Sequence, residues 1–212
     1  MISSILYLHG FASGPESTKG LFFRKQFAAL GIPVDLPDLN GGSFESLTIT
    51  GQLEIIESCV AGSLPSAIIG SSLGGYLAAL YAARHPKQVQ SLVLLAPGFG
   101  FGRRWPEWLG QQTVQRWKAE GWMEMYHYGL KRHVRLGYQL LEDSQRYEDY
   151  PDVRDPTLIF HGTRDVVVSP RYSEEFAKGR PNVRLEFLDS DHELVDMLDT
   201  MWPEILEFLN RR

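Results

Sequence analysis

The stretch IIGSSLGGYLAAL (68–80) runs from an apolar, strand-like segment through three glycines and two adjacent serines into a helix rich in alanine and leucine. Its central pentapeptide has the spacing G-x-S-x-G, with Ser72 in the middle. A strand-to-helix turn tight enough to lift one side chain above a sheet leaves room only for glycine beside it. The pattern therefore predicts a raised serine hydroxyl, although an ordinary glycine-rich loop has a similar composition.

Short apolar runs alternate with segments of helical period along the rest of the chain. This order predicts an α/β fold, with a mostly parallel sheet of about six strands and helices on both faces. Pro203 predicts a kink or restart of the last helix near Trp202. The expected strands are 5–10, 33–37, 66–70, 91–97, 157–162 and 183–189, and the expected helices are 19–30, 51–61, 73–84, 171–178 and 193–210.

The region 99–156 breaks the alternation. It has no clear buried strand, yet it holds four of the five tryptophans and many tyrosines. A segment of this length inside a compact domain is usually functional, and helical spacing in 107–120 and 138–147 indicates a folded insertion. The stretch 122–138 could also form a short hairpin. We expect a single domain over 1–212, with 99–156 as a cap over the carboxyl edge of the sheet.

Composition narrows the class of protein. The length of 212 residues suits one domain, and the net charge of −5 argues against a nucleic-acid partner. No apolar run approaches the roughly 20 residues that span a bilayer, and the amino-terminal run is too short for a secretory signal. A cytoplasmic location is the resulting expectation, and the oligomeric state stays open.

A serine nucleophile requires a histidine as general base and a carboxylate to hold that histidine. In a fold of this kind the three follow in the order serine, acid, histidine. Of the six histidines, only His192, in DSDHEL, follows a late expected strand. Asp165, in TLIFHGTRD, follows the strand before it and is the expected acid, with Asp189 or Asp191 as alternatives. This chemistry requires no metal and no cofactor.

Attack on a carbonyl creates an oxyanion, which preorganised backbone N–H groups stabilise. One donor should be the N–H of Leu73, at the start of the helix after Ser72. The second should be the N–H of Phe11, in the loop after the first strand. His9, in that loop, and His161, in a second His-Gly pair, are expected to be structural residues.

The tryptophans of the insertion are candidate substrate contacts. Aromatic side chains under a lid favour an apolar acyl or alcohol group over a highly charged one. Trp105, Trp108 and Trp122 are the tentative substrate-binding residues. The alternative is that they form the small core of the insertion itself.

Four motifs in order, HGF, GSSLGG, GTRD and SDHEL, resemble those of the α/β-hydrolase superfamily across nearly the whole chain. The opening LYLHGF-S-x-P-x-S-x-K, which ends at Lys19, and the terminal DHEL are similar to small bacterial esterases of the YqiA type. Lys19 itself is expected to be a solvated lysine at the start of a helix.

This resemblance implies a serine hydrolase that cleaves a small, apolar carboxylic ester or thioester through an acyl-serine intermediate. Two alternatives stay open. One is a carbon-carbon bond hydrolase or peptidase that uses the same triad, and the other is a non-catalytic binding protein of the same fold.

Overall fold

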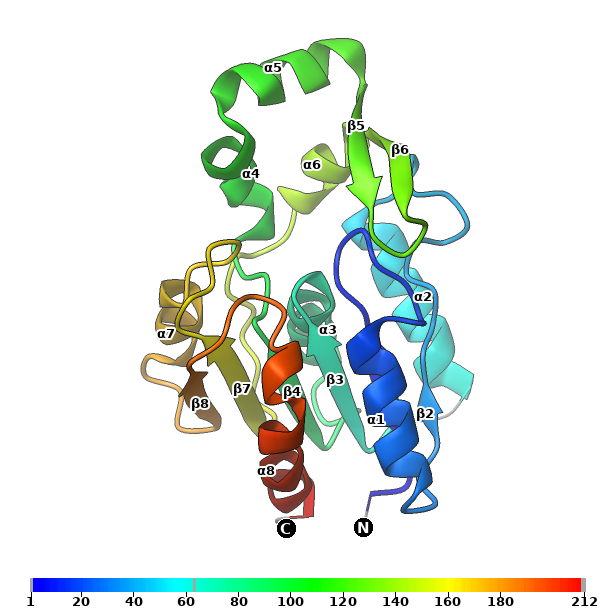
Figure 1. The fold of residues 1–212 in the computed structure, drawn as a ribbon, viewed down its shortest axis with the longest axis vertical. Helices are drawn as coiled ribbons and strands as arrows, with labels where there is room; N and C mark the ends of the chain where they lie inside the picture. Colours follow the sequence, from blue (N-terminus) through cyan, green and yellow to red (C-terminus); the bar gives the residue numbers. More distant parts are fainter. Residues whose placement is uncertain (1, 63, 211–212) are drawn as a thin grey trace.

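The computed structural model describes residues 2–62 and 64–210 and contains a six-stranded parallel sheet in the order β2-β1-β3-β4-β7-β8 (Figure 1). All six strands predicted from the sequence are confirmed. They are β1 (Ile5–Leu8), β2 (Val34–Asp35), β3 (Ala67–Ser71), β4 (Ser91–Leu95), β7 (Thr157–Gly162) and β8 (Val183–Leu188).

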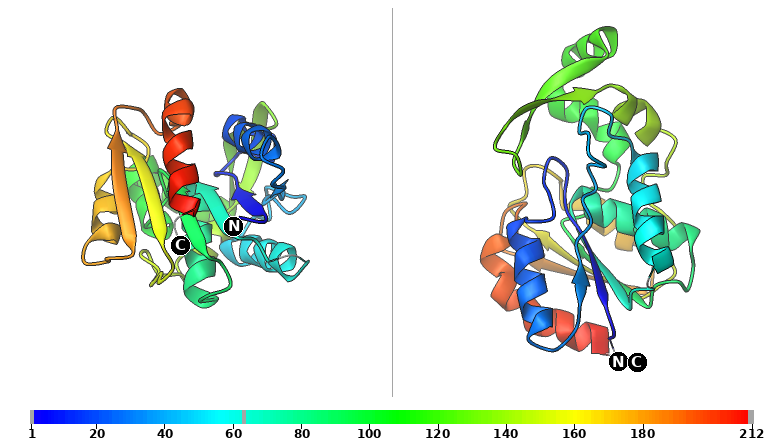
Figure 2. Two further views of the ribbon diagram at one scale, coloured as in Figure 1. Left: turned by 90° about the horizontal axis from the view of Figure 1, so that it is seen from below. Right: turned by 90° about the vertical axis from the view of Figure 1, so that its right-hand side faces the viewer.

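Helices cover both faces of this sheet, as the alternating pattern predicts. Helices α1 and α8 lie on one face, and α2 and α3 lie on the other (Figure 2). The helices outside the insertion are α1 (Thr18–Ala28), α2 (Ile49–Gly62), α3 (Leu73–Arg84), α7 (Arg171–Ala177) and α8 (Leu198–Asn210).

The core divides into two clusters because side chains alternate between the faces of each strand. On β3, Ile68 packs toward α2 and α3, while Ile69 packs toward α1 and α8. Both are fully buried. A strand buried on both faces reads as a continuous apolar run, which is why the sequence shows these strands so clearly.

The last helix begins later than the sequence predicts. A 3-10 turn (Val195–Met197, η1) precedes α8, and Leu194 before it is buried with a left-handed φ of 54°. Helix α8 then runs unbroken from Leu198 to Asn210 with Pro203 inside it, so the expected restart near Trp202 is wrong. The break in helical conformation falls at Leu194 instead, between the loop that carries His192 and the helix.

The insertion 99–156 lies between β4 and β7 and is folded throughout most of its length. It comprises α4 (Phe101–Leu109), α5 (Gln111–Glu120), β5 (Trp122–His127), β6 (Arg132–Gly137) and α6 (Gln139–Ser144). Strands β5 and β6 pair antiparallel, so the hairpin interpretation of 122–138 is confirmed. Figure 1 shows these elements beyond the carboxyl ends of the sheet strands.

Candidate active site

Ser72 stands at the turn between β3 and α3 in a strained backbone conformation. Its φ of 51° and ψ of −117° are unusual for any residue other than glycine. The Ser72 N–H donates to the Leu95 carbonyl at 2.8 Å, and the Ser72 carbonyl accepts from the N–H of Gly98 at 2.8 Å. These bonds to β4 and the segment after it hold the strained turn in place, and such strain is common at functional sites.

The glycines around Ser72 are explained by close backbone contacts. A Cβ on Gly70 would lie 2.4 Å from the Gly74 carbonyl oxygen, and one on Gly74 would lie 2.2 Å from the Leu8 carbonyl oxygen. Neither position accepts a side chain unless the backbone moves. The G-x-S-x-G spacing is thus the packing requirement of this turn.

The structure brings the three predicted residues of the candidate triad together. Ser72 Oγ lies 3.0 Å from His192 Nε2, and His192 Nδ1 lies 2.7 Å from Asp165 Oδ2. An ionised carboxylate can only accept, so Nδ1 carries the proton and Nε2 is free to accept the Ser72 hydroxyl proton. The alternative acids have other partners, since Asp189 pairs with Arg164 at 2.7 Å and Asp191 accepts from the Glu193 N–H at 2.9 Å.

Asp165 is surrounded by hydrogen-bond donors. Its Oδ1 accepts the N–H groups of Val167 and Val168, each at 2.8 Å, and its Oδ2 accepts from His192 and His161. Burial by itself would raise the pKa of this carboxyl, but the hydrogen bonds from His161 and His192 outweigh it and hold the pKa well below its ordinary value. Asp165 therefore stays ionised and keeps the imidazole of His192 in one tautomer.

Two neighbouring loops carry Asp165 and His192 and are tied to each other. The N–H of Arg164 donates to the Ser190 carbonyl at 3.0 Å. A Cβ on Gly162, at the end of β7, would lie 2.4 Å from the carbonyl oxygens of Ser190 and Asp191. The absence of a side chain at Gly162 lets the second loop pass close enough for His192 to reach Asp165.

His161 touches the acid, which the sequence reasoning missed. Its Nε2 lies 3.1 Å from Asp165 Oδ2 and 2.9 Å from the Val168 carbonyl oxygen, so this nitrogen carries a proton. In the neutral ring Nδ1 then accepts from the Ser173 hydroxyl at 2.7 Å. The ring is completely buried. The available signal was the spacing in HGTRD, which places a histidine four residues before the acid.

The loop after β1 lies against the nucleophile turn. A Cβ on Gly10 would be 3.4 Å from Ser72 Cβ, so the residue before Phe11 lies against the Ser72 side chain. His9 Nδ1 donates to the Gly10 carbonyl at 2.9 Å and Nε2 accepts the Leu39 N–H at 3.0 Å, which confirms the structural role expected for His9. Leu73 opens α3, with its N–H at the amino end of the helix.

The turn of the β5–β6 hairpin also holds this loop. The carbonyl of Ala12 accepts the Tyr128 N–H at 2.8 Å, and Ala12 has a left-handed φ of 53°. Ala12 is buried, and it follows Phe11 in the sequence. The insertion therefore contributes to the backbone conformation next to the expected oxyanion donor.

The tryptophans of the insertion differ in their surroundings. Trp105 is 2% exposed and packs edge-on against Phe11, with ring centroids 5.7 Å apart. Trp108 is 51% exposed and lies beside Trp105 at 5.2 Å. Trp122 is partly buried under the guanidinium of Arg135 at 4.1 Å. Of the three tentative substrate contacts, Trp105 thus packs directly on the loop that borders Ser72.

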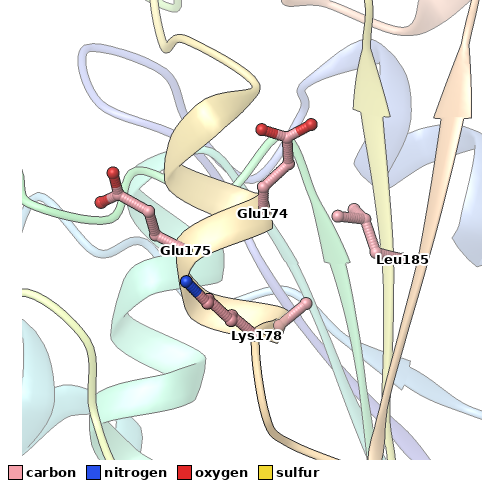
Figure 3. Close-up of a pocket in the computed structure, with 5 residues that line it drawn as sticks. Glu174, Glu175, Lys178 and Leu185 are labelled. Carbon is pink, nitrogen blue, oxygen red and sulfur yellow. The ribbon is translucent and has the colours of Figure 1, made fainter.

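A separate concavity of about 580 Å³ lies between α7 and β8 (Figure 3). It is lined by Glu174, Glu175, Ala177, Lys178 and Leu185. None of the residues predicted for the active site lines it, so it is not part of the candidate site.

A six-stranded parallel sheet with helices on both faces and a serine at the β3–α3 turn defines an α/β-hydrolase fold. The chain belongs to the family described as Uncharacterised protein family (UPF0227), whose model matches residues 4–210. This match and the relatives described next confirm the resemblance to esterase-like members of the α/β-hydrolase superfamily that the motifs indicate.

Known relatives include ester hydrolases. Monoacylglycerol lipase abhd6-B of Xenopus laevis is 34% identical over 103 residues, which are 44% of this chain and 30% of that protein. Human monoacylglycerol lipase ABHD6 is 24% identical over 233 aligned positions, which cover 88% of this chain and 68% of that protein. The chain thus spans less than a third of the first relative and about two thirds of the second.

Among solved structures, the α/β hydrolase domain-containing protein 10 from mouse superposes with a TM-score of 0.76 at 18% identity. The match covers 98% of this chain and 90% of the mouse chain and supports the fold. In the part of the chain that the structure describes, no helix is both long and apolar enough to cross a bilayer.

Proposed function

We propose that the protein is a serine hydrolase that cleaves a carboxylic ester or thioester through an acyl-Ser72 intermediate. The observation that carries this proposal is the hydrogen-bonded chain from Ser72 through His192 to Asp165, assembled from three separate loops. The α/β-hydrolase fold and relatives named as monoacylglycerol lipases support the same class of reaction.

In the first half of the reaction, Ser72 Oγ forms a bond to the substrate carbonyl carbon while its proton passes to His192 Nε2. The negative charge that develops on the carbonyl oxygen is stabilised by the N–H groups of Phe11 and Leu73. Donors of this kind contribute about 2.7–4 kcal/mol each when measured by deletion. Asp165 remains ionised and stabilises the imidazolium through Nδ1.

The tetrahedral intermediate then collapses. The bond from the carbonyl carbon to the leaving group breaks, and the leaving alcohol or thiol takes the proton from His192 Nε2. A water molecule next gives a proton to Nε2 and attacks the acyl carbon, after which the Ser72 Oγ–acyl bond breaks and Oγ regains the proton. The product is the carboxylic acid.

We further propose that the insertion 99–156 forms the cap of this single domain and supplies an apolar wall for the substrate. The packing of Trp105 on Phe11 supports this role, since it joins the insertion to the proposed oxyanion loop. Because Trp105 itself is 2% exposed, less buried neighbours would form the surface that the substrate meets. Trp108 packs against Trp105, and its exposed ring carries this aromatic cluster to the protein surface. A small apolar acyl or alcohol group suits such a wall.

The proposal is tested with a fluorophosphonate probe and a panel of esters and thioesters of graded chain length, including a monoacylglycerol. The purified protein should be labelled at Ser72 and should hydrolyse short apolar esters. The variant Ser72→Ala, with unchanged circular dichroism, should do neither. A wild-type protein that takes no label and turns over no member of the panel would instead be a binding protein of this fold.

A further inference from the structure

Lys19 is buried, although the sequence predicts a solvated lysine. It is the second residue of α1 and is 6% exposed. A helix amino terminus repels a cation, and burial of a charge is costly unless the charge is paired. Two unfavourable effects thus act on this ammonium group, and specific partners must offset them.

Both observed partners of Lys19 belong to the residue that follows the proposed base. Lys19 Nζ donates to the Glu193 carbonyl oxygen at 2.6 Å and to Glu193 Oε2 at 3.3 Å. The Glu193 side chain is 68% exposed, so the ion pair itself is weak. The short bond to the backbone carbonyl is the one that restrains the chain.

This bond fixes the His192 loop from the side of α1. The same loop is also held from the end of β7, by the close approach at Gly162 and by the Arg164 N–H bond to Ser190. Helices α1 and α8 cover the same face of the sheet (Figure 2), so the loop between β8 and η1 passes within reach of α1.

We propose that Lys19 is a positioning residue that holds the carbonyl of Glu193 and thereby sets His192 at hydrogen-bonding distance from Ser72. This inference rests on the proposed function of Ser72 and His192. A displacement of about 1 Å in a reacting group can reduce a rate by 10²-fold, so one restraint next to the base is sufficient for a large effect.

The Lys19 ammonium group is subject to two opposing influences. Burial lowers its pKa, while the charges of Glu193, Asp191 and Asp165 act in the opposite direction and favour the ammonium form. An ammonium group has three N–H donors and no acceptor, so it can hold the Glu193 carbonyl and the Glu193 carboxylate at the same time.

The test compares Lys19→Met with Lys25→Met, a matched change at an exposed position of the same helix. Lys19→Met keeps a side chain of similar length and should lower kcat by about 10²-fold with KM unchanged. Lys25→Met should match the wild type in both. Lys19→Met with wild-type kcat would overturn the inference.

If Lys19→Met does not fold, Glu193→Gln decides, since its exposed side chain can be changed without disturbing the core. It leaves the carbonyl bond in place and removes only the carboxylate charge. The inference then requires kcat to stay within about twofold of the wild-type value, because the exposed ion pair is weak. A loss of about 10²-fold would place the effect in the carboxylate and overturn the inference. Loss of all activity in Ser72→Ala separates these outcomes from failure of the proposed function.

Discussion

Replacing Asp165 by asparagine reverses the hydrogen-bond polarity at one end of the candidate triad. The amide oxygen of asparagine would take the place of Oδ1, where it accepts the N–H groups of Val167 and Val168. The NH₂ group would then face the N–H groups of His192 and His161, which Oδ2 accepts in the native protein. Donor would oppose donor at both contacts.

His192 relieves this conflict by moving its proton from Nδ1 to Nε2. A protonated Nε2 cannot accept the hydroxyl proton of Ser72, so the base is lost although its position is kept. By analogy with other triads we expect kcat to fall about 10⁴-fold, which corresponds to roughly 5 kcal/mol in the activation barrier. In the variant, the Nε2–H of His161 would face the NH₂ group of the new asparagine in the core. This unsatisfied contact should lower the free energy of unfolding by about 1–3 kcal/mol.

The pH dependence of stability gives a second measure of the same residue. Because the folded pKa of Asp165 lies below its ordinary value, its ionised form stabilises the native state above about pH 4. That contribution is lost as the pH falls further toward the folded pKa. Asp165→Asn should therefore flatten the acid limb of a plot of unfolding free energy against pH.

The assays are stopped-flow hydrolysis of p-nitrophenyl acetate and urea unfolding followed by tryptophan fluorescence. The controls are Asp189→Asn and Asp191→Asn, and both should keep kcat within about twofold because neither side chain bonds to His192. If Asp165→Asn keeps more than about a tenth of the wild-type kcat, the assignment is refuted. A large loss in either control would move the acid to that residue.

Three further outcomes are expected. Ser72→Ala and His192→Ala should each lower kcat by about 10⁶-fold, and the double variant should be no worse than either, as steady-state kinetics will show. Gly74→Ala should lower the free energy of unfolding in urea by about 1–3 kcal/mol or more, because its Cβ would lie 2.2 Å from a carbonyl oxygen of β1. Trp105→Ala should lower the free energy of unfolding by about 3–5 kcal/mol in the same assay, because the side chain is buried. Trp108→Ala should fold normally and change KM or the ester chain length that the enzyme prefers, because the side chain is exposed. Equal stability of the two tryptophan variants would contradict the difference in burial.

The sequence was sufficient to predict the sheet and the residues that meet at its carboxyl edge. Strands buried on both faces must be apolar throughout, so each appears as a continuous run, and the turn at Ser72 must exclude side chains, so it appears as glycines. The separate motifs that hold Asp165 and His192 each follow a strand. Because parallel strands end at the same edge, their order along the chain already brings these loops to one side of the sheet.

The contacts between distant segments were decided only by the tertiary structure. From the sequence, His161 is predicted to be an ordinary structural histidine, because nothing local shows that it contacts Asp165. Lys19 is predicted to be a solvated lysine, because its partner Glu193 lies 174 positions away along the chain. The same is true of the bond from Tyr128 in the hairpin to Ala12. Side-chain type and spacing determine which elements form, whereas the partners of a buried polar group depend on how those elements pack, and a linear pattern does not contain that information.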